Sequence, residues 1–135
     1  MKGLLADVNT RGPVADLVRR MQTAPWADFW EQLHLSLFHF EDVGLTPSST
    51  DQEIWVRCQA DGLILVTNNR NARSPDSLEL TIRQFNQPDS LPIFTIADLD
   101  KFRKSRQYAE RVLERAYDYL LRIGEVRGTG RLFLP

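Results

Sequence analysis

Residues 62–71 read GLILVTNNRN, and this stretch decides the fold that we expect. Leu63 to Val66 form an unbroken apolar run that contains β-branched residues, and a row of polar residues follows it. An apolar run of this length, without polar alternation, is typical of a strand that is covered on both faces, as in parallel sheets. In open α/β sheets, ligands bind just outside the carboxyl ends of the strands. The polar cluster at residues 67–71 is therefore the first candidate for a functional site.

Strand-like and helix-like patterns alternate along the rest of the chain. Helical spacing and capping residues predict helices over residues 13–21, 26–33, 50–60, 77–85 and 99–123, the last of them ended by Gly124. Apolar or alternating runs predict strands over residues 2–6, 34–43, 63–66, 91–96 and 131–134. This order predicts a three-layer α/β/α sandwich with a mostly parallel central sheet of about four to five strands. We expect residues 1–135 to form one domain.

The composition excludes several classes of protein. A single cysteine, Cys58, rules out an internal disulfide framework and a multi-cysteine zinc site. No apolar run approaches the roughly 18 residues that a membrane-spanning helix needs, so a cytoplasmic location is the default expectation. The net charge is −1, but Lys and Arg outnumber Asp and Glu by nine to six in residues 98–135. Residues 1–97 carry eight basic and twelve acidic residues, which indicates an acidic centre beside a basic flank.

Carboxylates recur where the predicted strands end and where a helix begins. The strand-end acids are Asp7, Glu41, Asp42, Asp98 and Asp100, and the acids that open the third helix are Asp51 and Glu53. Because the carboxyl ends of parallel strands meet at one edge of a sheet, we expect some of these acids to approach residues 67–71. Each acid also has a simpler interpretation as a turn or capping residue. Thr50 and Glu53 in particular have the spacing of a capping box, and an acid at position 51 suits the positive end of a helix.

Four segments together resemble the small stand-alone branch of the PIN-domain (PilT N-terminus) nucleases. Residues 4–9 (LLADVN) correspond to the family's first strand, which ends in Leu-Leu-Asp-Glu-Asn. Residues 42–45 (DVGL) and 50–54 (TDQEI) correspond to an acidic residue before Gly-Leu and to a Ser-Asp-x-Glu-Ile helix start. Residues 62–71 correspond to Gly-x-x-Leu-Val-Thr-x-Asp-x-Asp. The resemblance covers roughly the first 71 residues.

The resemblance implies a ribonuclease of the toxin–antitoxin type that uses Mg²⁺ or Mn²⁺ to orient a water for attack on an RNA phosphodiester. It implies catalytic residues Asp7, Asp51, Asn69 and Asn71, metal ligands Asp7, Asp51, Glu53 and Asp42, and substrate-binding residues Asn9, Thr67, Asn68 and Arg70. The chain departs from the family at Asn69 and Asn71, where aspartates are expected. An amide oxygen can coordinate a hard cation but brings no negative charge, so the metal would be bound weakly or lost.

Two further functional classes stay open on the sequence alone. The first is a non-catalytic PIN-fold module that binds RNA or a protein partner such as an antitoxin. Its RNA surface would be the predicted last helix, where Lys104, Arg111, Arg115 and Arg122 lie near one side with Tyr108 and Tyr119 between them. The same face could equally be solvated and salt-bridged. The second class is an assembly subunit, because small domains of this kind readily form homodimers through symmetric surfaces.

Overall fold

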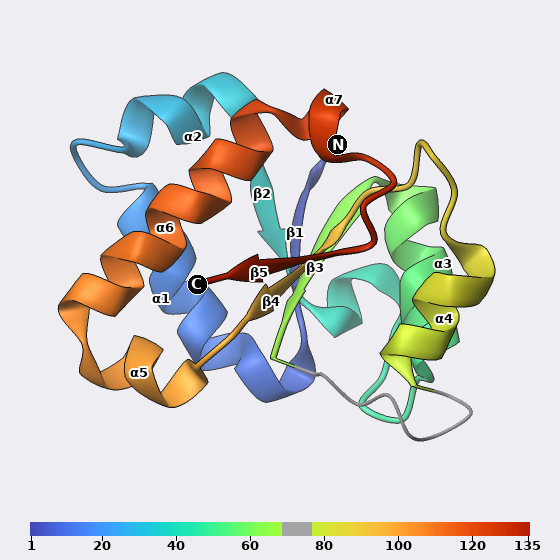
Figure 1. Ribbon diagram of the computed structural model, residues 1–135. Helices are drawn as coiled ribbons and strands as arrows, with labels where there is room; N and C mark the ends of the chain where they lie inside the picture. Colours follow the sequence, from blue (N-terminus) through green and yellow to red (C-terminus); the bar gives the residue numbers. More distant parts are fainter. Residues whose placement is uncertain (69–76) are drawn as a thin grey trace.

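The computed structural model describes residues 1–68 and 77–135. Its centre is a five-stranded sheet in which every neighbouring pair of strands is parallel (Figure 1). The strands are β1 (Gly3–Ala6), β2 (Ser36–Phe38), β3 (Leu63–Thr67), β4 (Ile93–Ile96) and β5 (Arg131–Leu134), and their order across the sheet is β2-β1-β3-β4-β5. The prediction of an α/β fold with a mostly parallel sheet is confirmed, and the sheet is parallel throughout.

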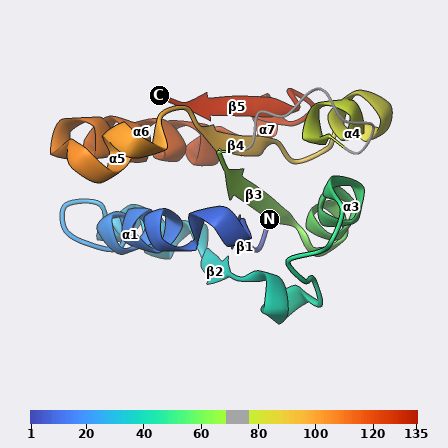
Figure 2. The same cartoon turned by 90° about the horizontal axis from the view of Figure 1, so that it is seen from below.

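Helices cover both faces of the sheet (Figures 1 and 2). One face carries α1 (Arg11–Met21), α2 (Ala27–Leu33), α5 (Leu99–Lys104) and α6 (Arg106–Leu121), and the other carries α3 (Asp51–Asp61) and α4 (Leu78–Phe85). The described residues also form three short helices: η1 (Val8–Thr10), η2 (Phe40–Val43) and α7 (Ile123–Val126). The predicted three-layer arrangement is therefore present.

The buried strands are apolar because each strand supplies two cores. In β3, Ile64 and Val66 pack into the core on the α1 and α6 face, whereas Leu63 and Leu65 pack into the core on the α3 and α4 face. Successive side chains of a strand point to opposite faces, so a strand that is covered on both sides has no position for a solvated residue. This is the physical origin of the unbroken apolar run in the sequence.

At the β2 edge, the sheet depends on a residue without a side chain. Gly3 of β1 pairs with Ser36 of β2, and a Cβ atom at position 3 would lie 2.0 Å from the Ser36 carbonyl oxygen. That distance is far inside van der Waals contact. The two strands can therefore pair in this register only with glycine at position 3.

Two predicted elements differ from the observed ones. The strand predicted over residues 34–43 is only Ser36–Phe38, because the Asp42 carboxylate accepts a hydrogen bond from the His39 backbone N–H at 2.8 Å and the chain turns into η2. Glu41 and Asp42 therefore lie in a helical turn after the strand. The Glu41 carboxylate forms a salt bridge with Arg11 at 2.9 Å.

The helix predicted over residues 99–123 is divided into α5, α6 and α7. The Ser105 hydroxyl accepts a hydrogen bond from the Tyr108 backbone N–H at 3.1 Å and so starts a new helix at Arg106. Gly124, predicted to end the helix, lies inside α7 instead. Among the described residues, no helix combines the length and the apolar character that crossing a membrane requires.

Shortening a side chain of the central strand should test whether β3 packs into a core on each face of the sheet. Ile64 is fully buried, and Ile64→Ala should lower the free energy of unfolding by about 2–5 kcal/mol, measured by urea denaturation. Val56→Ala is the control, because the Val56 side chain is 53% exposed and its truncation should cost no more than about 0.5 kcal/mol. Equal losses in the two variants would contradict a two-sided core at β3.

Candidate functional site

The order of the strands singles out one position on the sheet. After β1 the chain adds β2 on one side, and it then crosses to add β3, β4 and β5 on the other side. The chain that leaves β1 enters α1 on one face of the sheet, and the next helix after β3, α4, lies on the other face, so the direction of winding changes between these two strands. In doubly wound α/β folds, ligands bind in the crevice at this switch point.

A hollow of about 300 Å³ lies at this point. Three separate parts of the chain line it: the end of β1 with η1, the stretch from η2 through the loop to the first turn of α3, and the residue that follows β3. The polar side chains among its lining residues include Asp7, Asn9, Asp51 and Asn68. The structure thus brings together four residues that the sequence nominated separately.

The carboxylate of Asp7 is held by the neighbouring strand. The Thr67 hydroxyl donates a hydrogen bond to Asp7 Oδ2 at 2.6 Å, and Thr67 itself is fully buried. The turn after Asp7 is fixed by Thr10, whose hydroxyl lies within hydrogen-bonding distance of the carbonyl oxygens of Asp7 and Val66. Thr67, nominated as a substrate-binding residue, thus makes a contact that orients Asp7.

Asp51 reaches the hollow from the first turn of α3. Its predecessor Thr50 is the N-cap, and the Thr50 hydroxyl accepts a hydrogen bond from the Glu53 backbone N–H at 3.1 Å. Since α3 begins at the carboxyl edge of the sheet, the positive end of this helix lies beside the hollow and favours negative charge there.

The other two nominated metal ligands have different surroundings. Glu53 Oε1 lies 3.1 Å from the Thr50 hydroxyl in the capping box, and Glu53 lines a separate hollow with Gly44 and Val56. Asp42 accepts the hydrogen bond from His39 in η2. Neither side chain is among those that line the hollow of Asp7 and Asp51. Asn69, Arg70 and Asn71 lie outside the described residues.

The donor set can be compared with the needs of a metal ion. Within residues 1–68 and 77–135, no three His, Cys, Asp or Glu side chains lie close enough together to hold a metal. Mg²⁺ and Mn²⁺ prefer oxygen ligands, and Mg²⁺ is commonly held by one or two carboxylates together with several waters. Two carboxylates beside two amides therefore fit an open site that binds a hard cation weakly, and they do not fit a closed structural metal site.

A buried polar row continues from this site across the sheet, and the sequence did not reveal it. Thr95 of β4 pairs in register with Thr67 of β3 and is also fully buried. Arg131 Nη1 donates to the Thr95 hydroxyl at 2.6 Å, and Arg131 Nε donates to Glu79 Oε1 of α4 at 2.5 Å. The Arg131 side chain is only 8% exposed. A threonine at the same level of two adjacent apolar strands is the one sequence signal that could have indicated this row.

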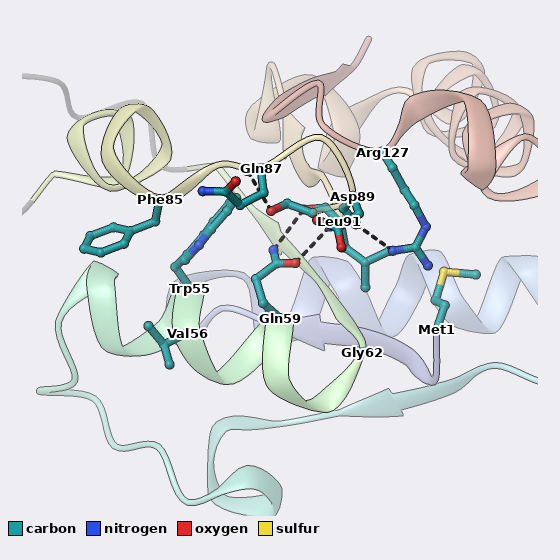
Figure 3. A pocket seen from close by; sticks show the side chains of 11 residues that line it. Met1, Trp55, Val56, Gln59, Gly62, Phe85, Gln87, Asp89, Leu91 and Arg127 are labelled. Atoms are coloured by element: carbon teal, nitrogen blue, oxygen red, sulfur yellow. Dashed lines mark hydrogen bonds between the residues drawn. The ribbon is translucent and has the colours of Figure 1, made fainter.

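The amino edge of the sheet carries a different hollow, of about 460 Å³, shown in Figure 3. Trp55, Val56 and Phe85 form its apolar side, and the Gln59 side chain bonds both the N–H and the carbonyl of Leu91. None of the nominated residues lines it.

The single cysteine is not an available nucleophile. Cys58 is buried in the core on the α3 and α4 face. Burial raises the pKa of its thiol to about 12, and the Asp61 carboxylate contributes in the same direction. The thiol is therefore protonated near neutral pH, which agrees with its place in the core.

Most of the cationic side chains in the basic stripe predicted for the last helix form contacts with other side chains of the same helix. Arg115 and Arg122 lie 3.8 and 2.7 Å from the Asp118 carboxylate, and the pKa of Asp118 is held below its usual value by the hydrogen bond from Arg122. The guanidinium of Arg111 lies over the Tyr108 ring and that of Arg115 over the Tyr119 ring. This pattern is that of a solvated, salt-bridged face.

Comparisons of the chain with protein-family models, with curated proteins and with solved structures found no match.

The polar row should contribute measurably to stability. Arg131→Met removes the ion-pair partner of the Glu79 carboxylate, which is partly buried. We expect a loss of about 3 kcal/mol in the free energy of unfolding. Adding Glu79→Gln removes the stranded charge, so the double variant should recover part of the loss. Additive losses in a double-mutant cycle would contradict a coupled row.

Proposed function

We propose that this chain is a PIN-like protein, related to metal-dependent ribonucleases of the toxin–antitoxin type, with an altered acidic site. The observation that supports the proposal best is the common hollow of Asp7 and Asp51 at the switch point of a parallel sheet. The two carboxylates are 44 positions apart in the sequence, and both fall within segments that resemble the family's motifs. A parallel α/β fold alone hosts many functions, so the proposal depends on the site.

In this proposal Asp7 and Asp51 bind Mg²⁺ or Mn²⁺ directly or through water. When bound, the metal supplies an activated water and neutralises charge on an RNA phosphodiester. Thr67 fixes the Asp7 carboxylate through the 2.6 Å hydrogen bond. Asn9 and Asn68 offer amide groups to the metal-bound waters or to phosphate oxygens from the wall of the same hollow.

The residues at 69–71 complete the proposed site by resemblance. Asn69 and Asn71 stand where the family has aspartates, and they would orient metal-bound waters or phosphate oxygens without adding charge. Arg70 would pair with a phosphate. The expected consequence is weaker metal binding than in a site with four carboxylates, because the charge of the ligands sets much of the affinity for a hard cation.

A second candidate is a non-catalytic module of the same fold that binds RNA or a protein partner, such as an antitoxin, or that forms a homodimer. The absence of a third carboxylate near Asp7 and Asp51 within the described residues favours it. The two candidates differ in whether RNA binding requires a divalent metal.

Metal titration should separate them. Calorimetric titration of Mn²⁺ should give a weak binding isotherm for the wild type and at least about a tenfold rise in Kd for Asp7→Asn or Asp51→Asn. Asp7→Asn retains an acceptor for the Thr67 hydroxyl, so it removes charge with little change of shape. Asp98→Asn is the matched control, because Asp98 is the N-cap of α5, where asparagine serves equally well.

No heat with wild-type protein at millimolar Mn²⁺ would exclude the metal-dependent function. RNA binding that falls steeply with salt and ignores Mn²⁺ would instead support the non-catalytic module. Cleavage of RNA that is lost in Asp7→Asn and retained in Asp98→Asn would establish the nuclease.

Restoring the family's charges tests the altered motif. The double variant Asn69→Asp and Asn71→Asp should lower the Kd for Mn²⁺ by at least about tenfold, since it adds two carboxylates to the proposed site. The same substitutions combined with Asp7→Asn should lose part of that gain. An unchanged Kd in the double variant would show that positions 69 and 71 do not belong to the metal site.

A further inference from the structure

A second site candidate lies away from the carboxylates, in a cleft of about 730 Å³ on the α1 and α6 face. It runs between the end of α1 with the following turn and the junction of α5 with α6. We call it the basic cleft, after its five cationic lining residues Arg19, Arg20, Arg103, Lys104 and Arg106. Among its lining residues, Glu110 is the single acid.

Salt bridges neutralise only part of this charge. Asp16 accepts hydrogen bonds from both Arg19 and Arg20, and Lys104 pairs with Asp100 at 3.1 Å. For Arg103 and Arg106, by contrast, no ion pair or hydrogen bond of the side chain is formed with residues 1–68 or 77–135. These two guanidinium groups flank the Ser105 cap, one on each side. The cleft therefore holds two arginines that form no direct ion pair with the described part of the chain, and Glu110 is the one acid that lines the cleft beside them.

The helix that begins here adds to the positive potential. The 16-residue helix α6 starts at Arg106, and its first turn contains no acidic residue. Cations at the N-terminus of a helix are unfavourable, because that end carries the positive part of the macrodipole. An anion between Arg103 and Arg106 would relieve this repulsion.

An aromatic side chain forms part of the wall. Trp26 lines the cleft and stacks against Tyr117, with 5.8 Å between ring centroids and 19° between planes. The Tyr117 hydroxyl donates to the Met21 carbonyl at 2.7 Å, which ties the stack to the end of α1. Trp26 is thus an aromatic platform that Tyr117 supports from one side. The rings of Tyr108 and Tyr119 differ from it, because Arg111 and Arg115 already lie over them.

We propose that the basic cleft binds a nucleotide phosphate, with Arg103 and Arg106 on the phosphate and Trp26 against the base. Guanidinium groups suit phosphate oxygens because they donate paired hydrogen bonds. Indole rings suit any base, since base stacking does not depend on sequence. An acidic peptide would satisfy the arginines and leave the aromatic wall unused. The site is independent of Asp7, Asp51 and a bound metal.

The test uses the full chain in buffer with EDTA, so that the carboxylate site contributes no metal-dependent binding. The ligands are AMP, ribose 5-phosphate, polyglutamate and a short single-stranded oligonucleotide. Arg103→Gln with Arg106→Gln should weaken oligonucleotide binding by about tenfold or more and reduce the magnitude of the salt slope by roughly one. Arg111→Gln with Arg115→Gln removes the same charge from another face of α6 and is the matched control.

Binding of AMP as well as the oligonucleotide would identify a free nucleotide as sufficient, and binding of the oligonucleotide alone would identify a strand. AMP or the oligonucleotide should also quench tryptophan fluorescence, and this quenching should be lost in Trp26→Phe if Trp26 is the platform. Polyglutamate bound as tightly as the oligonucleotide would overturn the assignment, as would equal losses in the two arginine pairs. Asp7→Asn should retain oligonucleotide binding in EDTA, which would show that the basic cleft is separate from the proposed nuclease site. A negative result for the nuclease would therefore leave the proposal for the basic cleft intact.

Discussion

The parallel pairing of β1 with β3 is the constraint on which the rest of the structure depends. Ala6 pairs with Val66, and the Asp7 backbone N–H donates to the Val66 carbonyl at 3.2 Å. This register places the Asp7 carboxylate level with the Thr67 hydroxyl. A parallel pair requires a crossover connection, and the crossover from β2 through α3 brings Asp51 to the same edge. The pairing of β1 with β3 and the crossover that joins β2 to β3 therefore bring the two carboxylates to the same hollow.

The sequence predicted those parts of the fold in which one residue type has one physical role. The apolar run at 63–66 suited a strand buried on both faces and is one, and Thr50 with Glu53 formed the expected capping box. The prediction was wrong where a short side chain competes for the backbone. Ser105 caps a new helix inside a continuous apolar stripe, and periodicity alone does not show such a break.

The candidate site was predictable only in part, for a related reason. Asp7 and Asp51 could be nominated because acids at strand ends and helix starts share an edge of the sheet, and because their flanking residues resemble the PIN-domain motifs. Arg131 could not, since an arginine in a four-residue strand looks like an exposed edge residue until its neighbours are known. Its burial depends on Thr95 and Glu79, which are 36 and 52 positions away. Long-range pairing of this kind leaves no local pattern in a single sequence.

The glycine at the β2 edge of the sheet has a consequence for the far end of the molecule. β2 leads directly into the segment of Phe40, Pro47 and Ser49, which forms one wall of the hollow that holds Asp7 and Asp51. The Cβ of an alanine at position 3 would clash with the Ser36 backbone and push β2 away from β1. That wall would then move with the strand. The close approach of the two strands at Gly3 thus also helps to position one wall of the carboxylate crevice, so position 3 should tolerate less sequence drift than its distance from the crevice suggests.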